Sequence, residues 1–136
     1  MANDQINLRP IGLIRSTLHS LEDAPRQGNE GAPDAWVEVD AGYLAALRGI
    51  SKGDSIIVIT FLDRADRTTL QTHPRNDPTI PMTGVFATRS PDRPNPLGLH
   101  RVTVKEVDMS RLRVGPIEAI DGTPVVDIKP VLLGDR

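Results

Sequence analysis

The most informative stretch for the fold is "HRVTVKEVDMSRLRVG", residues 100–115. Valines alternate with polar residues from Arg101 to Lys105, and Leu112 and Val114 alternate with arginines after a short break. A period of two residues is typical of a strand with one buried and one solvated face. The break, "DMS", is short enough for a tight turn, so the stretch predicts an antiparallel hairpin. Val102 and Val104 are expected to face inward, and Leu112 and Val114 alternate with Arg111 and Arg113.

The remainder of the chain is also divided into short extended segments. Twelve prolines and eleven glycines leave little room for long helices. The pattern predicts one short helix over residues 41–50 and further strands over residues 11–18, 35–40, 55–62, 84–88, 117–120 and 125–133. Roughly seven strands with mostly short connections favour a mainly antiparallel β structure, either a barrel or a sandwich.

Three details of this pattern are specific enough to test. In "SIIVITFL", residues 55–62, continuous β-branched residues favour burial on both faces of the strand. In the last strand Val126 and Ile128 are expected to face one way, and Asp127 and Lys129 the other. Residues 63–81 are polar, contain three prolines and show no hydrophobic periodicity, which indicates a long loop.

Length and composition limit the possible functions. The 136 residues fit a single domain, residues 1–136, and a formal net charge of −2 argues against a histone-like coat for nucleic acid. The absence of cysteine excludes disulfides and thiolate catalysis. His19, His73 and His100 are far apart, so no metal site is expected and surface or loop positions are predicted for them. No signal-peptide pattern or membrane-spanning run is found, which predicts a soluble cytoplasmic protein without a membrane partner.

A loop rich in arginine and proline is the strongest candidate for a binding site. "GVFATRSPDRPNPLGLHR", residues 84–101, contains three arginines and three prolines. The prolines restrict the backbone, so the loop loses little further entropy when it binds a ligand. Arg89 and Arg93 offer forked donors for a carboxylate, a phosphate or a base edge, and Asn95 can both donate and accept. A rigid strand connection, whose arginines are solvated or pair with Asp92, is equally compatible with this pattern.

The segment "IEAIDGTPVVDIKP", residues 117–130, is a second candidate. Glu118 stands in an apolar segment, where a carboxylate needs a partner. Such a carboxylate could also accept hydrogen bonds from the two hydroxyls of a ribose. Asp127 and Lys129 share one strand face, where a purely structural array of cross-strand ion pairs would also explain them.

The segment "APRQG", residues 24–28, is a third and weaker candidate. Pro25 could set a turn that directs Arg26 and Gln27 toward a ligand. Exposed loop residues of this kind usually have no function, and that possibility stays open.

Taken together, "IGLIRS", "APRQG", "GVFATRSPDRPNPLGL" and "DGTPVVDIKP", in this order, resemble one family. This is the YaeB-like (TsaA-like, TrmO-type) family of S-adenosylmethionine-dependent methyltransferases, which modify the N6 amine of a tRNA adenosine beside the anticodon. The resemblance extends over about residues 11–130. It implies a small single-sheet antiparallel β-barrel with one short helix and long loops, a homodimer, S-adenosylmethionine as the cofactor, and tRNA as a partner.

The resemblance also implies where the binding residues lie. The cofactor site would draw on Pro25, Arg26, Gln27, Leu62, Asp63, Phe86, Arg89, Leu99, Gly115, Pro116, Ile117 and Glu118. The acceptor site would draw on Arg93, Asn95, Arg101, Asp127 and Lys129. Methyl transfer from a sulfonium is an in-line displacement that mainly requires positioning and exclusion of water, so no indispensable general base is expected.

The chain departs from the family pattern in three places. Leu62 and Asp63 stand where the family usually has Phe-His, and Val131 follows Pro130 where the family usually has tyrosine. Larger members also carry a C-terminal extension that grips tRNA, which is not expected here. These departures leave open another nucleoside or a small molecule as the methyl acceptor. They also leave open a cofactor-binding module without catalysis and a purely structural barrel.

Overall fold

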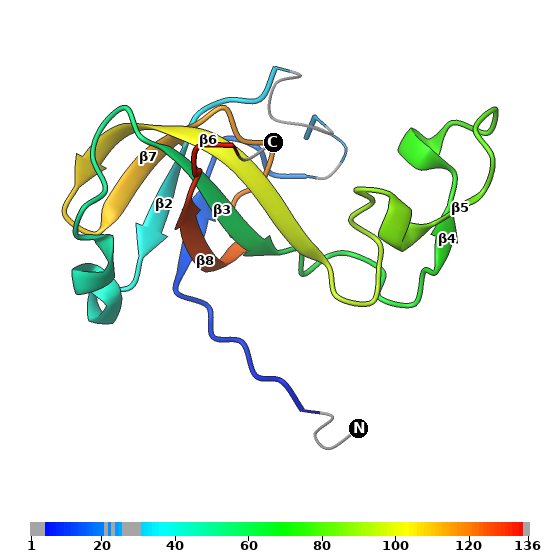
Figure 1. The fold of residues 1–136 in the computed structure, drawn as a ribbon, viewed down its shortest axis with the longest axis horizontal. Coiled ribbons are helices and arrows are strands. Elements are labelled where there is room, and N and C mark those ends of the chain that lie inside the picture. The colour runs from blue at the N-terminus through cyan, green and yellow to red at the C-terminus, as the bar shows by residue number, and fades with distance from the viewer. Residues whose placement is uncertain (1–4, 21, 23, 26–30, 135–136) are drawn as a thin grey trace.

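The structure is a computed structural model that describes residues 5–20, 22, 24–25 and 31–134. Within them, six strands close into an antiparallel barrel in the order β1–β2–β7–β6–β3–β8 (Figure 1). Their bounds are Gly12–Arg15 (β1), Ala35–Val39 (β2), Ser55–Phe61 (β3), Leu97–Asp108 (β6), Arg111–Gly115 (β7) and Pro124–Pro130 (β8). A short 3-10 helix, η2 (Ala41–Leu47), follows β2. The predicted mainly-β barrel with one short helix is therefore confirmed.

The hairpin predicted over residues 100–115 is formed by β6 and β7. Val104 pairs with Val114 and Val107 with Leu112, with a register shift between Val104 and Glu106. Val102, Val104, Leu112 and Val114 are all at most 3% exposed and belong to the core inside the barrel. The alternation of the sequence therefore identified the inward face of this hairpin correctly.

Strand β3 is buried on one face rather than on both. Ile56, Val58 and Thr60 face the core, whereas Ile57, Ile59 and Phe61 are only partly buried. The prediction of two buried faces was wrong because no helix covers the outside of the described barrel in the way that helices cover parallel sheets. The apolar outer face of β3 thus remains accessible.

Strand β8 contains an irregularity that changes which side chains enter the core. Its pairing with β3 shifts in register, because Ile59 pairs with Asp127 but Thr60 pairs with Val125. The extra residue, Val126, is a bulge. Val125 is fully buried and Ile128 packs against the core. The bulge thus interrupts the simple alternation that was expected of Val126 and Ile128 against Asp127 and Lys129.

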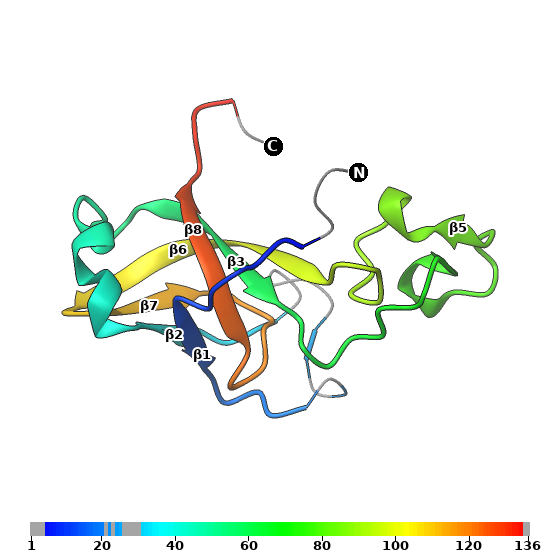
Figure 2. The ribbon, with the colours of Figure 1, turned by 90° about the horizontal axis from the view of Figure 1, so that it is seen from below.

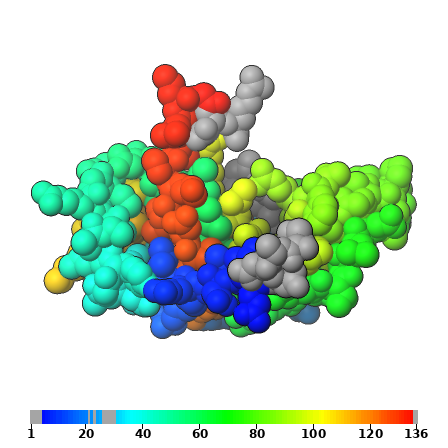
Figure 3. Space-filling model, turned by 60° about the horizontal axis from the view of Figure 1, so that its bottom comes forward, coloured from blue at the N-terminus to red at the C-terminus, as the bar shows by residue number. Residues whose placement is uncertain are grey.

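Residues 63–96 form an arm that projects from the barrel between β3 and β6, on the right of Figures 1 and 2 and also in the space-filling view of Figure 3. The arm contains a small sheet of β4 (Gln71–Thr72) and β5 (Thr83–Gly84) and two short 3-10 helices, η3 (Pro74–Asn76) and η4 (Val85–Ala87). The segment 63–81 is thus not structureless. A hydrogen bond from Leu62 N to Pro96 O (2.8 Å) closes the base of the arm.

Two predicted strands are replaced by other backbone conformations. Residues 85–87 form η4, because Thr88 N donates to Val85 O (3.0 Å) within a single turn. Residues 117–120 carry no strand pairing, and Ile117 N donates instead to Pro33 O (3.0 Å). In both places a short apolar run has the amino-acid composition of a strand. Composition alone does not show whether the backbone pairs with a neighbouring strand, and here it does not.

The antiparallel topology brings the longest loops to one end of the barrel. Strands β1, β3 and β7 end there and β2, β6 and β8 begin there, so residues 16–20, 31–34, 62–96 and 116–123 lie on this side of the barrel. We refer to it as the loop end. The opposite end carries η2 and the turn between β6 and β7. None of the described helices is long and apolar enough to cross a membrane.

Candidate functional site at the loop end

A chain of three polar side chains connects the barrel interior to the loop end. Thr60 Oγ1 lies 2.7 Å from His100 Nε2, and His100 Nδ1 lies 2.6 Å from Glu118 Oε1. Thr60 is fully buried, the His100 side chain is 4% exposed and the Glu118 side chain is 18% exposed. The partner that a carboxylate needs in this segment is therefore His100, and solvent reaches the chain from the glutamate side.

The position predicted for His100 was wrong. Its position was expected at the surface or in a loop, yet it lies inside the barrel on β6. The signal was present in the sequence, because His100 precedes Val102 and Val104 at the same period of two. Thr60 likewise continues the inward series of Ile56 and Val58 on β3. Alternation alone would have placed both polar side chains in the core.

The segment Gly115 to Glu118 contributes less of its surface than predicted. The side chain of Ile117 is fully buried in the core and its N–H is bonded to Pro33 O. Gly115 is also buried, and a Cβ atom there would collide with Asp34. Pro116, in contrast, is exposed. Within this segment only Pro116 and the Glu118 carboxylate are thus accessible to a ligand.

The arginine-proline loop of the arm is held by its own arginines. Arg93 Nη1 donates to Thr88 O and to Ser90 O, both at 3.0 Å. Asp92 Oδ1 accepts from Asp66 N (2.9 Å) instead of pairing with an arginine. The rigid connection is thus supported for Arg93, whose guanidinium bridges two carbonyls of the loop. Pairing of the arginines with Asp92 is not found among the described residues.

Arg67, which sequence reasoning missed, joins this loop to the barrel. Its Nε donates to Pro94 O (2.8 Å) and its Nη2 donates to Asn95 Oδ1 (3.1 Å). Its guanidinium also lies over the Phe61 ring, 5.6 Å from the centroid. Asn95 is therefore already engaged through its carbonyl oxygen, while its amide nitrogen remains a possible donor to a ligand.

The remaining predicted residues of the loop end differ in exposure. Arg89 and Asp63 are exposed, Phe86 is 83% exposed, and Leu62 and Pro25 are partly buried. Arg26 and Gln27 lie outside the described residues. Arg89, the candidate carboxylate partner, thus presents its guanidinium to solvent on the arm.

Four predicted residues lie together on the outside of the barrel rather than at its end. Leu99 pairs with Ile59, which pairs with Asp127, and Arg101 pairs with Ile57, which pairs with Lys129. The four side chains therefore flank the accessible face of β3 in two adjacent rows. Asp127 Oδ1 accepts from Ile128 N (2.9 Å), and no ion pair of Asp127 with Lys129 occurs in the described part of the chain.

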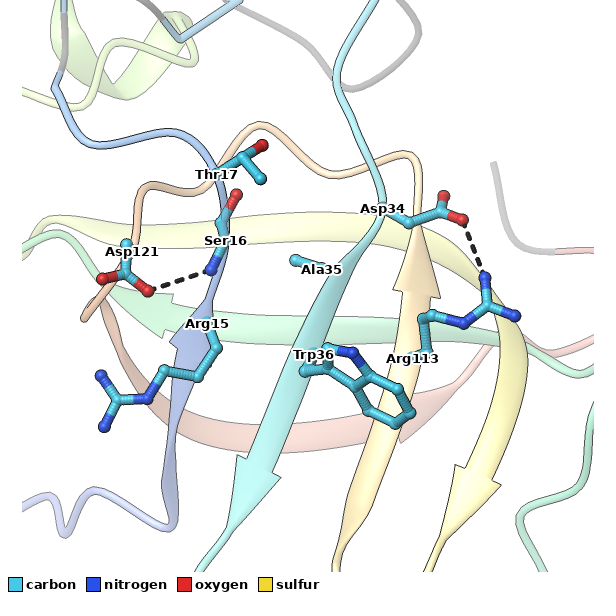
Figure 4. Close-up of a pocket in the computed structure, with 8 residues that line it drawn as sticks. All are labelled: Arg15, Ser16, Thr17, Asp34, Ala35, Trp36, Arg113 and Asp121. Carbon is cyan, nitrogen blue, oxygen red and sulfur yellow. Dashed lines mark hydrogen bonds and ion pairs between the residues drawn. The ribbon is translucent and has the colours of Figure 1, made fainter.

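A pocket of about 360 Å³ opens beside the loop end, and none of the predicted residues lines it. It is lined by Arg15, Ser16, Thr17, Asp34, Ala35, Trp36, Arg113 and Asp121 (Figure 4). Ser16 N donates to Asp121 Oδ1 (3.0 Å) on one side, and Arg113 Nη1 donates to Asp34 Oδ2 (3.1 Å) on the other. In the sequence, Arg15 and Trp36 alternate with the inward-facing residues of their strands. This alternation indicated that their side chains lie on the outer face, where the pocket is.

The arginines on this outer face are largely neutralised by carboxylates. Arg15 pairs with Glu38 (2.6 Å), and Arg113 pairs with Asp34 and, at 3.4 Å, with Glu106. Arg111 lies over the Trp36 ring, and its hydrogen bond with Asp108 raises the pKa of the guanidinium. The face therefore has little excess positive charge for an anionic ligand.

In chemical terms the loop end offers a carboxylate held at one oxygen, an exposed arginine and a stiff loop. A carboxylate accepts from hydroxyls or amines, and a guanidinium donates to carboxylates or phosphates. No group of three or more His, Asp or Glu side chains in the described residues could hold a metal ion. A polar ligand that carries both a hydroxyl pair and an acid group would match these two kinds of side chain.

Comparisons with known proteins identify relatives of this chain. A family model described as the tRNA-methyltransferase O N-terminal domain matches residues 13–133. The chain is 38% identical over 130 residues to a probable S-adenosyl-L-methionine-binding protein of Methanothermobacter thermautotrophicus, covering 96% of this chain and 93% of the relative. It is 40% identical over 122 residues to an S-adenosyl-L-methionine-binding protein of Archaeoglobus fulgidus, covering 90% and 86% respectively.

The fold is also found in solved structures. The crystal structure of TrmO from Pseudomonas aeruginosa is similar to this chain with a TM-score of 0.74 at 29% sequence identity. The match covers 94% of this chain and 56% of that chain, so this chain spans just over half the length of that solved protein. The family match from residue 13 to residue 133 and the shared barrel together show that this chain belongs to the tRNA-methyltransferase O N-terminal domain family.

Proposed function

We propose that the chain is an S-adenosylmethionine-dependent methyltransferase whose acceptor is the N6 amine of a modified adenosine beside the anticodon of tRNA. The observation that carries the proposal is that three of the segments that resemble the family motifs reach the loop end of one barrel, where β1 ends, the arm of residues 63–96 joins β6, and β8 begins. Family membership and relatives named as S-adenosyl-L-methionine-binding proteins support the cofactor. A tRNA acceptor would place the reaction in the cytoplasm.

The donor set at the loop end fits the parts of S-adenosylmethionine. The accessible side of the Glu118 carboxylate suits the two ribose hydroxyls, and the exposed Arg89 guanidinium suits the methionine carboxylate. The backbone N–H of Ile117 does not fit, because Pro33 O already accepts from it. The adenine ring would thus be held by other groups of the loop end than this amide.

In the proposed reaction the residues of this chain position and shield the reacting groups. When bound, S-adenosylmethionine supplies a methyl group activated by its sulfonium charge. Glu118 and Arg89 hold the ligand at two separate points, which restricts its rotation. The prolines of the arm and the hydrogen bonds of Arg67 and Arg93 keep the loop rigid. Such preorganisation accounts for catalysis by an in-line displacement without an indispensable base.

We also propose that the protein acts as a homodimer through the outer face of β3 and β6. Ile57, Ile59 and Phe61 form an apolar strip on β3, and the neighbouring Leu97 and Leu99 on β6 are 40% and 51% exposed. Apolar surface of this kind, bordered by polar residues, is typical of association sites. Arg101 and Lys129 border the strip, where they would contact either a second copy or the RNA backbone. Sedimentation velocity measures the mass of the assembly directly.

Calorimetric titration with S-adenosylmethionine tests the cofactor. One-site binding is expected, and Arg89→Ala should weaken it by about 1.5–3 kcal/mol, the range for a charged hydrogen bond. Equal affinity in the variant would remove Arg89 from the cofactor site. Arg64→Ala is a matched control, because Arg64 is another exposed arginine of the arm and donates to His19 O.

Transfer of a labelled methyl group then tests the acceptor. Tight cofactor binding with turnover on tRNA supports the full proposal. Binding with turnover only on nucleosides or small molecules would keep the activity and replace the acceptor. Binding without turnover on any acceptor would favour a cofactor-binding module, the function closest to the names of the archaeal relatives.

A further inference from the structure

Two polar residues interrupt the otherwise apolar interior of the barrel. Thr60 and His100 are buried within an otherwise apolar cluster that contains Val58 and Val102. Polar side chains in such places reduce stability unless every donor and acceptor is paired. No buried side-chain nitrogen or oxygen in the described residues lacks a partner, so the buried polar atoms of Thr60 and His100 are all paired. A paired polar cluster that reaches the candidate site can serve that site.

The hydrogen bonds determine where the protons lie. The Glu118 carboxylate can only accept, so His100 Nδ1 must donate to its Oε1. The buried Thr60 hydroxyl has His100 Nε2 as its hydrogen-bond partner, so its proton is satisfied only if Nε2 is unprotonated and accepts. The direction of donation therefore runs from Thr60 through His100 to Glu118. This direction of donation requires the Nδ1–H tautomer of His100.

Glu118 is left with one oxygen held and one oxygen available. Oε1 accepts from His100, whereas Oε2 has no hydrogen-bond partner in the described part of the chain. The Glu118 side chain is 18% exposed and that of His100 only 4%. Oε2 is therefore the atom of the cluster that a ligand at the loop end can meet.

We propose that His100 is a positioning residue that orients Glu118 toward the ligand, and that Thr60 selects the tautomer of His100 required for this. The ligand group would be a hydrogen-bond donor, namely the vicinal hydroxyls of a ribose. This inference rests on the proposed function, because it assigns the ribose of S-adenosylmethionine to Glu118. It adds two buried residues that act without touching the ligand.

Two isosteric substitutions separate positioning from a purely structural role. In His100→Asn the amide nitrogen occupies the place of Nδ1 and still donates to Glu118. In His100→Gln the amide reaches the place of Nε2, contacts Thr60, and leaves Glu118 without its donor. Both variants lose one hydrogen bond of the buried cluster, so both are expected to unfold more easily than wild type. Only His100→Gln should weaken S-adenosylmethionine binding, roughly 10- to 100-fold, as expected when a charged hydrogen bond is lost.

A double-mutant cycle identifies the residue through which His100 acts. Glu118→Gln turns the exposed carboxylate oxygen into a donor and should weaken binding by a similar factor. If His100 acts through Glu118, adding His100→Gln to Glu118→Gln should change the affinity no further than about twofold. Multiplicative losses, or equal losses in His100→Asn and His100→Gln, would overturn the proposal. Unchanged affinity in both Glu118→Gln and His100→Gln would also overturn it while leaving the cofactor assignment intact.

Two further measurements tie the effect to the ribose and to the proton. Wild-type protein should prefer S-adenosylhomocysteine over its 2′-deoxy analogue, and His100→Gln should lose most of this preference. Nitrogen NMR of the His100 ring should show a protonated Nδ1 and an unprotonated Nε2; a neutral Nε2–H tautomer would contradict the inference. Absence of any S-adenosylmethionine binding by wild type, in contrast, would refute the proposed function and, with it, the ligand assigned to Glu118.

Discussion

Gly98 leaves the space that the buried cluster occupies, and replacing it should be costly. A Cβ atom at this position would lie 2.5 Å from Thr60 Oγ1 and 2.8 Å from His100 Nε2, whereas ordinary contacts begin at 3.4 Å. The backbone of Gly98 lies outside the left-handed region, so alanine is not excluded by its φ angle. The expected damage therefore comes from the displaced side chains alone.

The magnitude follows from the two side chains that must move. Overpacking of a dense interior costs about 1–3 kcal/mol. Displacing either partner also stretches the 2.7 Å hydrogen bond between two buried groups, whose loss costs about 1–3 kcal/mol. Because one movement can relieve part of both effects, we expect Gly98→Ala to lose about 2–4 kcal/mol of unfolding free energy.

Urea denaturation measures this loss. With a slope of about 2 kcal/mol per molar urea for a small domain, the midpoint should fall by about 1–2 M. Gly84→Ala is the matched control, because nothing lies within 4 Å of its Cβ position and its φ of −61° suits alanine. The control should remain within about 0.5 kcal/mol of wild type. A Gly98→Ala midpoint equal to that of the control would refute the argument that Thr60 and His100 are held rigidly.

Two other predictions concern the arm and the outer face of the barrel. A hydrogen bond from Thr68 lowers the pKa of Asp66 below its ordinary value of 3.8, and one from Thr79 does the same for Asp77. The two turns are therefore fully stabilised above pH 3.8, and this stabilisation is lost as the pH falls through the lowered pKa values. NMR titration of the Thr68 and Thr79 amides should give midpoints below 3.8, and midpoints at or above this value would contradict the assignment. Leu99→Glu should convert the proposed dimer into a monomer in sedimentation velocity. The control Val107→Glu, on the same strand near its opposite end, should leave the mass unchanged. Equal masses for Leu99→Glu and wild type would exclude this face as the interface.

Local features of the protein could be predicted from the amino-acid sequence. The period of two over residues 100–115 predicted the β6–β7 hairpin and its inward face. The prolines of residues 84–101 marked a rigid connection, and motif resemblance pointed to the family that the comparisons then showed. Such features depend on neighbours in the chain, because side-chain direction and backbone restriction are set within a few residues.

The contacts between residues that are distant in the sequence became visible in the folded barrel. His100 and Thr60 are forty positions apart, and His100 and Glu118 are eighteen apart. The β3–β6 register brings the first pair to adjacent strands of the closed barrel, and an irregular segment after β7 brings Glu118 to the same end. The bulge at Val126 likewise depends on the pairing of β8 with β3. Pairing register and barrel closure are cooperative properties of the whole sheet, so no local pattern could specify these contacts.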